Sequence, residues 1–180
     1  GRNKRHLEFS DGTPFFWLGD TWWLALVQRK GWGLPEFQSL AADRVAKGFT
    51  VVQIVAGLYP DLPPYDPRGF NEGGHPWEPE YARINPAYFD AADRRIAALV
   101  SAGLTPCIVA AWGYHLPWLG IEHMKQHWRY LVARWGSYPV VWCLAGEATM
   151  PYYLSAQRDA DALFQKQGWT EIGRYVRTVD

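Results

Sequence analysis

The sequence has little of several features that would assign it to a functional class. Lys and Arg number 18 against 18 Asp and Glu, so the formal net charge of the 180 residues is zero, and no block of basic residues is present. This balance argues against nucleic acid as a partner. No apolar run approaches the roughly 20 residues that a membrane-spanning helix needs, which argues against a membrane as a partner.

Cysteine is also scarce, since only Cys107 and Cys143 occur, both inside apolar segments. Two cysteines do not make a disulfide scaffold in a chain of this size, so we expect two reduced core thiols. A disulfide stays open as an alternative, because neighbouring parallel strands could bring the two sulfurs close. The glycine patterns of dinucleotide-binding and phosphate-binding loops are absent, as is the serine elbow of hydrolases, and we expect no cofactor.

Aromatic residues, by contrast, are plentiful, with eleven Trp and ten Tyr. Trp and Tyr rings pave many sugar-binding clefts, and they also pack ordinary cores. We assign more than half of the tryptophans to packing. Four of these lie within strand or helix patterns: Trp17, Trp128, Trp135 and Trp142.

Four apolar segments have the character of buried parallel strands, and helical patterns separate them. The expected strands are residues 15–20, 51–55, 107–112 and 140–147. Polar or aromatic residues gather where each strand ends, which is typical of parallel α/β barrel enzymes. We therefore predict a single α/β domain over 1–180, a (β/α)8-type barrel with only about four β-α units. A complete barrel usually needs about 250 residues.

The expected helices follow from apolar spacing and from their end signals. The first lies between Pro35 and Gly48, and the second begins at the N-cap Asn85 and ends before Gly103. A third ends at Trp135. In the last helical region the expected buried positions are Leu163, Phe164, Ile172, Val176 and Val179.

Glu147 is the most informative single residue, because it directly follows an apolar strand. Such a Glu could be a simple cap or ion-pair partner. However, the preceding Ala145 and Gly146 leave room for a ligand, which favours a general acid. Asp20 ends the first expected strand and could either brace a loop or accept hydrogen bonds from sugar hydroxyls. His75 and His115 lie in loops at the same end of the barrel and are candidate ligand contacts.

A family resemblance supports this interpretation. The segment 11–22, DGTPFFWLGDTW, resembles the start of the apiosidase-like glycoside hydrolases, a family of (β/α)8 barrels. Similar stretches recur at 55–60, 85–93, 106–113 and 142–147, so the resemblance covers nearly the whole chain. It implies hydrolysis of glycosidic bonds in plant or microbial polysaccharides or oligosaccharides. It also implies that Glu147 is the acid/base residue after the fourth strand.

This interpretation includes a sugar-binding subsite and a second catalytic carboxylate. We expect Asp20, Trp22, Tyr59, Trp112 and His115 to line the sugar subsite, together with His75 and Trp118. The family's second catalytic carboxylate usually follows the seventh strand, so we expect it beyond residue 180; Asp20 is the nearest candidate within residues 1–180. The chain is then either the first half of a longer barrel or a half-barrel that must pair. Because polysaccharides are usually met outside the cytoplasm, a secreted or periplasmic location is favoured.

Two other hypotheses remain. The cleft could belong to a carbohydrate-binding pseudoenzyme without turnover, since no second acid is evident. A metal-dependent barrel hydrolase is the third hypothesis. His123 and His127 have a spacing that suits a metal pair, but no third ligand accompanies them, so we expect solvated helix residues and no metal.

Overall fold

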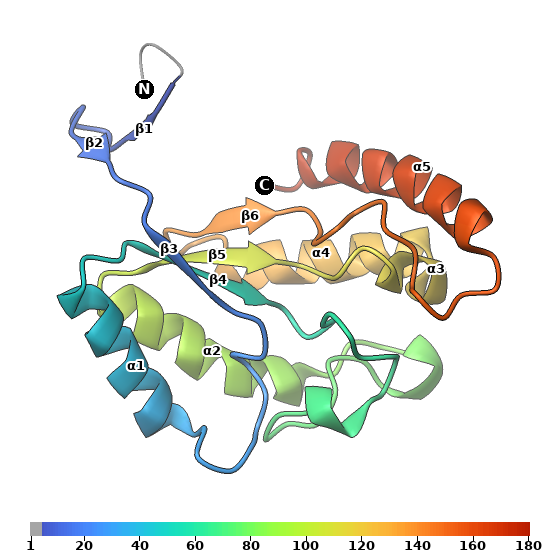
Figure 1. Cartoon of the computed structure of the whole chain (residues 1–180), viewed down its shortest axis with the longest axis horizontal. Helices are drawn as coiled ribbons and strands as arrows, with labels where there is room; N and C mark the ends of the chain where they lie inside the picture. Colours follow the sequence, from blue (N-terminus) through green and yellow to red (C-terminus); the bar gives the residue numbers. More distant parts are fainter. Residues whose placement is uncertain (1–4) are drawn as a thin grey trace.

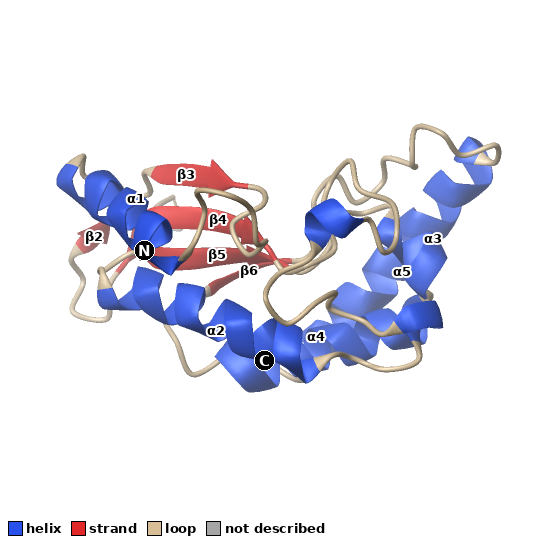
Figure 2. Ribbon diagram, turned by 90° about the horizontal axis from the view of Figure 1, so that it is seen from below, coloured by secondary structure: helices blue, strands red, loops and turns tan. Residues whose placement is uncertain are grey.

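A four-stranded parallel sheet lies at the centre of the molecule. The computed structural model describes residues 5–180, and Figure 1 shows its path. The strands are β3 (Gly19–Trp22), β4 (Val51–Val55), β5 (Thr105–Val109) and β6 (Val141–Cys143), hydrogen-bonded in that order. Their arrows all point the same way, and the connecting loops gather beyond the arrowheads (Figure 2). This is the predicted barrel-type arrangement with four β-α units.

Within residues 5–180, five helices connect or follow these strands. They are α1 (Leu34–Ala46), α2 (Pro86–Ser101), α3 (His115–Leu119), α4 (Ile121–Trp135) and α5 (Arg158–Val176). Two short 3-10 turns, Pro67–Gly69 and Pro79–Tyr81, lie in the long loop between β4 and α2. The short helix α3 was not predicted, because five residues are too few to show a helical period. No helix within residues 5–180 has the length and apolarity required to cross a membrane.

The first expected strand, 15–20, is wrong in its bounds. Pro14–Phe15 instead forms β2 of a small hairpin with β1 (Leu7–Glu8), which projects from one end of the sheet (Figure 1). The turn residue Gly12 has a φ of +88°, and its neighbour Asp11 accepts a hydrogen bond from the Thr13 N–H. β3 therefore begins at Gly19, and Trp17 lies outside the core with 43% of its surface exposed.

The helices α1, α2 and α4 cover one face of the sheet, which we call the outer face. One layer of this face consists of Trp22, Ile54, Ile108 and Trp142, which lie side by side in the strand register. Trp22 packs edge-on against Phe37 of α1, and Trp142 packs against Trp128 of α4. Side chains alternate between the two faces of a strand, so the residues between these point to the inner face.

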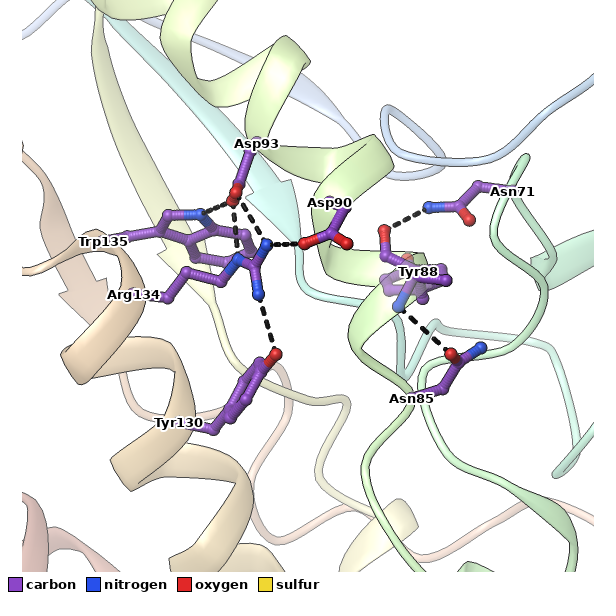
Figure 3. A network of polar contacts seen from close by, with 9 residues as sticks. Asn71, Asn85, Tyr88, Asp90, Asp93, Tyr130, Arg134 and Trp135 are labelled. Atoms are coloured by element: carbon purple, nitrogen blue, oxygen red, sulfur yellow. Dashed lines mark hydrogen bonds and ion pairs between the residues drawn. The ribbon is translucent and has the colours of Figure 1, made fainter.

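Charged residues join α2 to α4 on the outer side of this layer. Figure 3 shows the Arg134 side chain of α4 reaching Asp93 and Asp90 of α2. The guanidinium donates to both oxygens of Asp93 at 2.8 and 2.7 Å and to the Tyr130 hydroxyl at 2.7 Å. The indole of Trp135 also donates to Asp93, at 2.7 Å. These bonds fix the position of α4 relative to α2.

The inner face carries a smaller apolar cluster and the two cysteines. Val55 and Val109 pack there against Tyr59 and Leu62 of the following loop. Cys107 and Cys143 extend the same face as free thiols, Cys107 buried and Cys143 half-buried. Burial raises the pKa of both thiols.

The buried face of α5 differs in part from the prediction. Ile172 and Val176 are buried, as expected, but Leu163 and Phe164 are 57% and 39% exposed. The buried stripe instead begins at Gln165, whose amide donates to the carbonyls of Ala148 and Met150. A polar residue therefore occupies a core position because it satisfies two loop carbonyls, which hydrophobic spacing does not reveal.

Candidate active site

A pocket of about 510 Å³ lies at the carboxyl ends of the strands. The segments after β3, β4, β5 and β6 all contribute to it, as in barrel enzymes that build their sites from several strand ends. Its walls combine aromatic and aliphatic side chains with two carboxylates and one guanidinium. The lining residues are Trp23, Leu24, Pro60, Asp61, Leu62, Arg68, Trp112 and Glu147.

Glu147 follows β6 and is exposed to this pocket. Its Oε2 atom accepts a hydrogen bond of 3.1 Å from the Trp112 indole N–H. The backbone of Glu147 has a φ of +45°, in the left-handed region that non-glycine residues rarely adopt. Backbone strain of this kind persists only where the surroundings enforce it, and it clusters at functional sites.

Trp112 and Trp23 form the aromatic part of the wall. Trp112 is 8% exposed, and the Trp23 ring meets it edge-on with centroids 5.1 Å apart. Trp23 is 44% exposed, so a large part of its ring can meet a ligand. An exposed indole ring beside a carboxylate suits a ligand with both C–H faces and hydroxyl groups, such as a sugar.

The long loop after β4 supplies Pro60, Asp61, Leu62 and Arg68 to the lining. Asp61 has a φ of +58°, and its N–H donates to the Tyr114 hydroxyl at 2.5 Å. Arg68 pairs with Asp66 at 2.7 Å, and its hydrogen bonds lower the pKa of the Asp66 carboxyl. The pocket therefore carries the carboxyl groups of Asp61 and Glu147 beside a cation that is already paired with Asp66.

Tyr59 and His115 support this loop from beneath and do not line the pocket. The His115 ring is 2% exposed, and its Nε2 donates to the Tyr59 carbonyl at 2.8 Å. Burial lowers the pKa of His115 to about 4, so the ring is neutral. The Tyr59 hydroxyl is buried against that of Tyr88, 2.7 Å away.

His75 and Trp118 lie in neighbouring aromatic clusters, also outside the pocket lining. His75 packs against Tyr65 with ring centroids 4.7 Å apart, and burial lowers its pKa to about 4. Trp118 is half-buried and packs edge-on against His115 and Tyr152. Of the predicted site residues, the structure thus brings together only Glu147 and Trp112 in the pocket.

Asp20 and Trp22 lie on the outer face of the sheet. Asp20 is an interior residue of β3, and its carboxylate accepts hydrogen bonds from Arg44 of α1 and from the Trp22 indole. Trp22 is 8% exposed and belongs to the core beneath α1. Because β3 ends two residues later than expected, Trp23 rather than Trp22 reaches the pocket.

His127 differs from the prediction of a solvated residue, whereas His123 is exposed as expected. His127 is fully buried, with Nε2 donating to the Ala110 carbonyl at 3.1 Å. Its Nδ1 accepts from the indole of Trp77, which the long loop carries onto α4. Among the described residues, no group of three or more His, Cys, Asp or Glu side chains could hold a metal ion.

Comparisons with known proteins agree with this architecture. The family described as "Apiosidase-like, catalytic domain" matches residues 1–180. A solved structure described as a glycoside hydrolase has a TM-score of 0.74 at 21% identity over 98% of this chain. A family 5 glycoside hydrolase from Bacteroides vulgatus ATCC 8482 has a TM-score of 0.72 at 19% identity over 100% of it. No curated protein matches the chain.

A third similar structure is the exo-beta-1,4-mannosidase Op5Man5 from Opitutaceae bacterium strain TAV5. It has a TM-score of 0.61 at 17% identity and is matched by 97% of this chain. The chain spans 37%, 36% and 32% of the lengths of these three structures. It therefore corresponds to part of a (β/α)8-type barrel.

Proposed function

The chain belongs to the apiosidase-like family of catalytic domains, and we propose that it carries the general acid/base of a glycoside hydrolase. The substrate would be a plant or microbial polysaccharide or oligosaccharide. One observation carries the proposal: the Glu147 carboxylate lies in the turn that follows β6, in a pocket walled by indole rings. A carboxyl group in that setting can protonate the leaving-group oxygen and later activate water.

A glycosidase needs a second carboxylate on the other side of the scissile bond. Asp20 does not suit this role, because it faces α1 and bonds to Arg44. Asp61 lines the pocket, and we propose that it accepts hydrogen bonds from sugar hydroxyls. The second catalytic carboxylate would then come from the C-terminal part of the barrel, since the chain spans about a third of similar glycoside hydrolases.

Sugar binding is proposed for the residues that line the pocket. Trp23 and Trp112 offer ring surface, while Asp61 and Arg68 offer an acceptor and donors. Tyr59, His75, His115 and Trp118 would act indirectly by holding the loops that carry these groups.

The experiment compares the protein at its native length with its Glu147→Gln variant. Release of reducing ends from a panel of polysaccharides and oligosaccharides should fall about 10² to 10⁴-fold in the variant, because general acid–base catalysis contributes that much. Glu122→Gln, on an exposed site of α4, is the matched control and should retain full activity. A loss of only a few-fold in Glu147→Gln would refute the acid/base role.

The same panel distinguishes the alternative of a carbohydrate-binding pseudoenzyme, which would keep the pocket without turnover. In that case calorimetry would show saccharide binding by the native protein, while long incubation would release no reducing ends. Hydrolysis that survives a chelator would exclude the metal-dependent alternative.

A further inference from the structure

The hydrogen bond between Trp112 and Glu147 has a chemical consequence beyond forming a pocket wall. We infer that Trp112 is a positioning residue that determines which oxygen of Glu147 carries the catalytic proton. The inference rests on the proposed function of Glu147. Its basis is the indole N–H, which points to Oε2 at 3.1 Å.

The backbone holds both residues at the point where β5 and β6 leave the sheet. Trp112 and Gly146 form a parallel bridge beyond the last regular pairs of the two strands. The Gly113 N–H donates to the Gly146 carbonyl at 2.6 Å, and the Gly146 N–H donates to the Ala111 carbonyl at 3.1 Å. The indole and the carboxylate thus come from segments fixed to each other by main-chain bonds.

Two glycines permit this close approach. A Cβ atom on Gly146 would lie 2.1 Å from two ring carbons of Trp112, so any side chain there would displace the indole. A Cβ on Gly113 would lie 2.5 Å from the Glu147 carbonyl oxygen. The left-handed φ of Glu147, +45°, is held in the same turn. Glycine at these two positions therefore allows the indole to approach the carboxylate.

The chemistry follows from the nature of the donor. An indole N–H can only donate, so in the protonated carboxyl group it pairs best with the carbonyl oxygen, which is a better acceptor than the hydroxyl oxygen. The proton is therefore placed on Oε1, the oxygen that Trp112 leaves free. Fixing the proton on one oxygen aims it at the glycosidic oxygen, and such orientation is worth large factors in rate.

The kinetic test uses Trp112→Phe in the protein at its native length, with two glycosides of the sugar that the native enzyme cleaves. A methyl glycoside needs protonation of its leaving group, whereas a 4-nitrophenyl glycoside does not. We expect kcat/KM to fall about 10 to 100-fold on the methyl glycoside and less than about 3-fold on the nitrophenyl glycoside. An equal loss on both substrates would mean lost binding alone and would overturn the inference.

Controls separate this inference from the proposed function. Trp128→Phe makes the same chemical change in the outer core, where the indole N–H has no partner, and should leave the ratio of the two rates unchanged. Glu147→Gln should show the same substrate dependence as Trp112→Phe, but more strongly. If Glu147→Gln shows none, the proposed function fails; if only Trp112→Phe shows none, the positioning role fails.

A second measurement needs no substrate. The indole ¹⁵N–¹H signal of Trp112, identified by its loss in Trp112→Phe, should shift and exchange faster with solvent in Glu147→Ala. The signal of Trp135, bonded to Asp93, should stay in place. An unchanged Trp112 signal in Glu147→Ala would show that the hydrogen bond does not form, and would overturn the inference whatever the activity.

Discussion

The burial of His127 predicts a specific loss of stability at acid pH. Its ring is 0% exposed and bonded at both nitrogens, with Nε2–H donating to the Ala110 carbonyl and Nδ1 accepting from the Trp77 indole. A second proton would have to go on Nδ1, where it would face another N–H. Burial accordingly lowers the pKa of His127 from its ordinary 6.5 to about 4.

The sign and size of the effect follow from linkage. Below pH 6.5 the unfolded chain binds a proton at this histidine, while the folded protein stays neutral until about pH 4. Folding stability therefore falls as pH falls through this window. At pH 5 the unfolded side chain is almost fully protonated and the buried one only about a tenth, which costs about 2 kcal/mol relative to pH 8.

The assay is urea denaturation at pH 8 and pH 5 of the protein at its native length and of His127→Gln. The variant is less stable at pH 8, but its stability should fall by about 2 kcal/mol less between the two pH values. Met124→Leu is the control, because Met124 is a buried residue of the same helix and does not titrate. Equal falls in the native protein and His127→Gln would refute the reasoning.

Three further predictions concern the Arg134 contacts between α2 and α4, the glycine that contacts the Trp112 ring, and the exposed tryptophan of the pocket. Arg134→Met removes the two-point hydrogen bonding to Asp93 and should lower the free energy of unfolding by about 1 to 3 kcal/mol in urea denaturation. Lys125→Met should cost less than about 1 kcal/mol, because it loses only single contacts to two more exposed carboxylates. Gly146→Ala should reduce kcat at least about 10-fold in a folded protein, since its Cβ displaces the Trp112 ring, and an unchanged kcat would contradict the close contact. Trp23→Ala should raise KM about 3 to 10-fold with little change in kcat, because it removes exposed ring surface from the pocket, and a KM equal to that of the native enzyme would place the sugar elsewhere.

Much of the fold could be predicted because parallel strands and their helices leave strong local signals. The continuous apolar runs of β4 and β5 and the caps of α2 are local features, and all were predicted near their observed positions. The fourth strand was predicted too long, over 140–147, because β6 ends at Cys143 and Glu147 follows it in a turn. Strand ends were less certain. Because side chains alternate between the two faces of a strand, an error of one residue places a side chain on the wrong face.

The candidate site was harder to predict for this reason and because it depends on a long loop. Asp20 and Trp22 were expected in the site, whereas Trp23 lines the pocket, because β3 begins and ends later than the apolar pattern suggests. Asp61 and Arg68 line the pocket because of the conformation of the long loop after β4, whose sequence has no regular spacing of apolar residues. The burial of His127 likewise depends on Trp77, fifty positions away in the chain.

The central claim is that Glu147 donates the proton that releases the leaving group. The most direct measurement is the ratio of kcat/KM for a 4-nitrophenyl glycoside to that for the methyl glycoside of the same sugar, in the native protein and in Glu147→Gln. The account predicts that the substitution raises this ratio at least about 100-fold, because only the methyl glycoside needs the acid. A ratio unchanged by the substitution would contradict it.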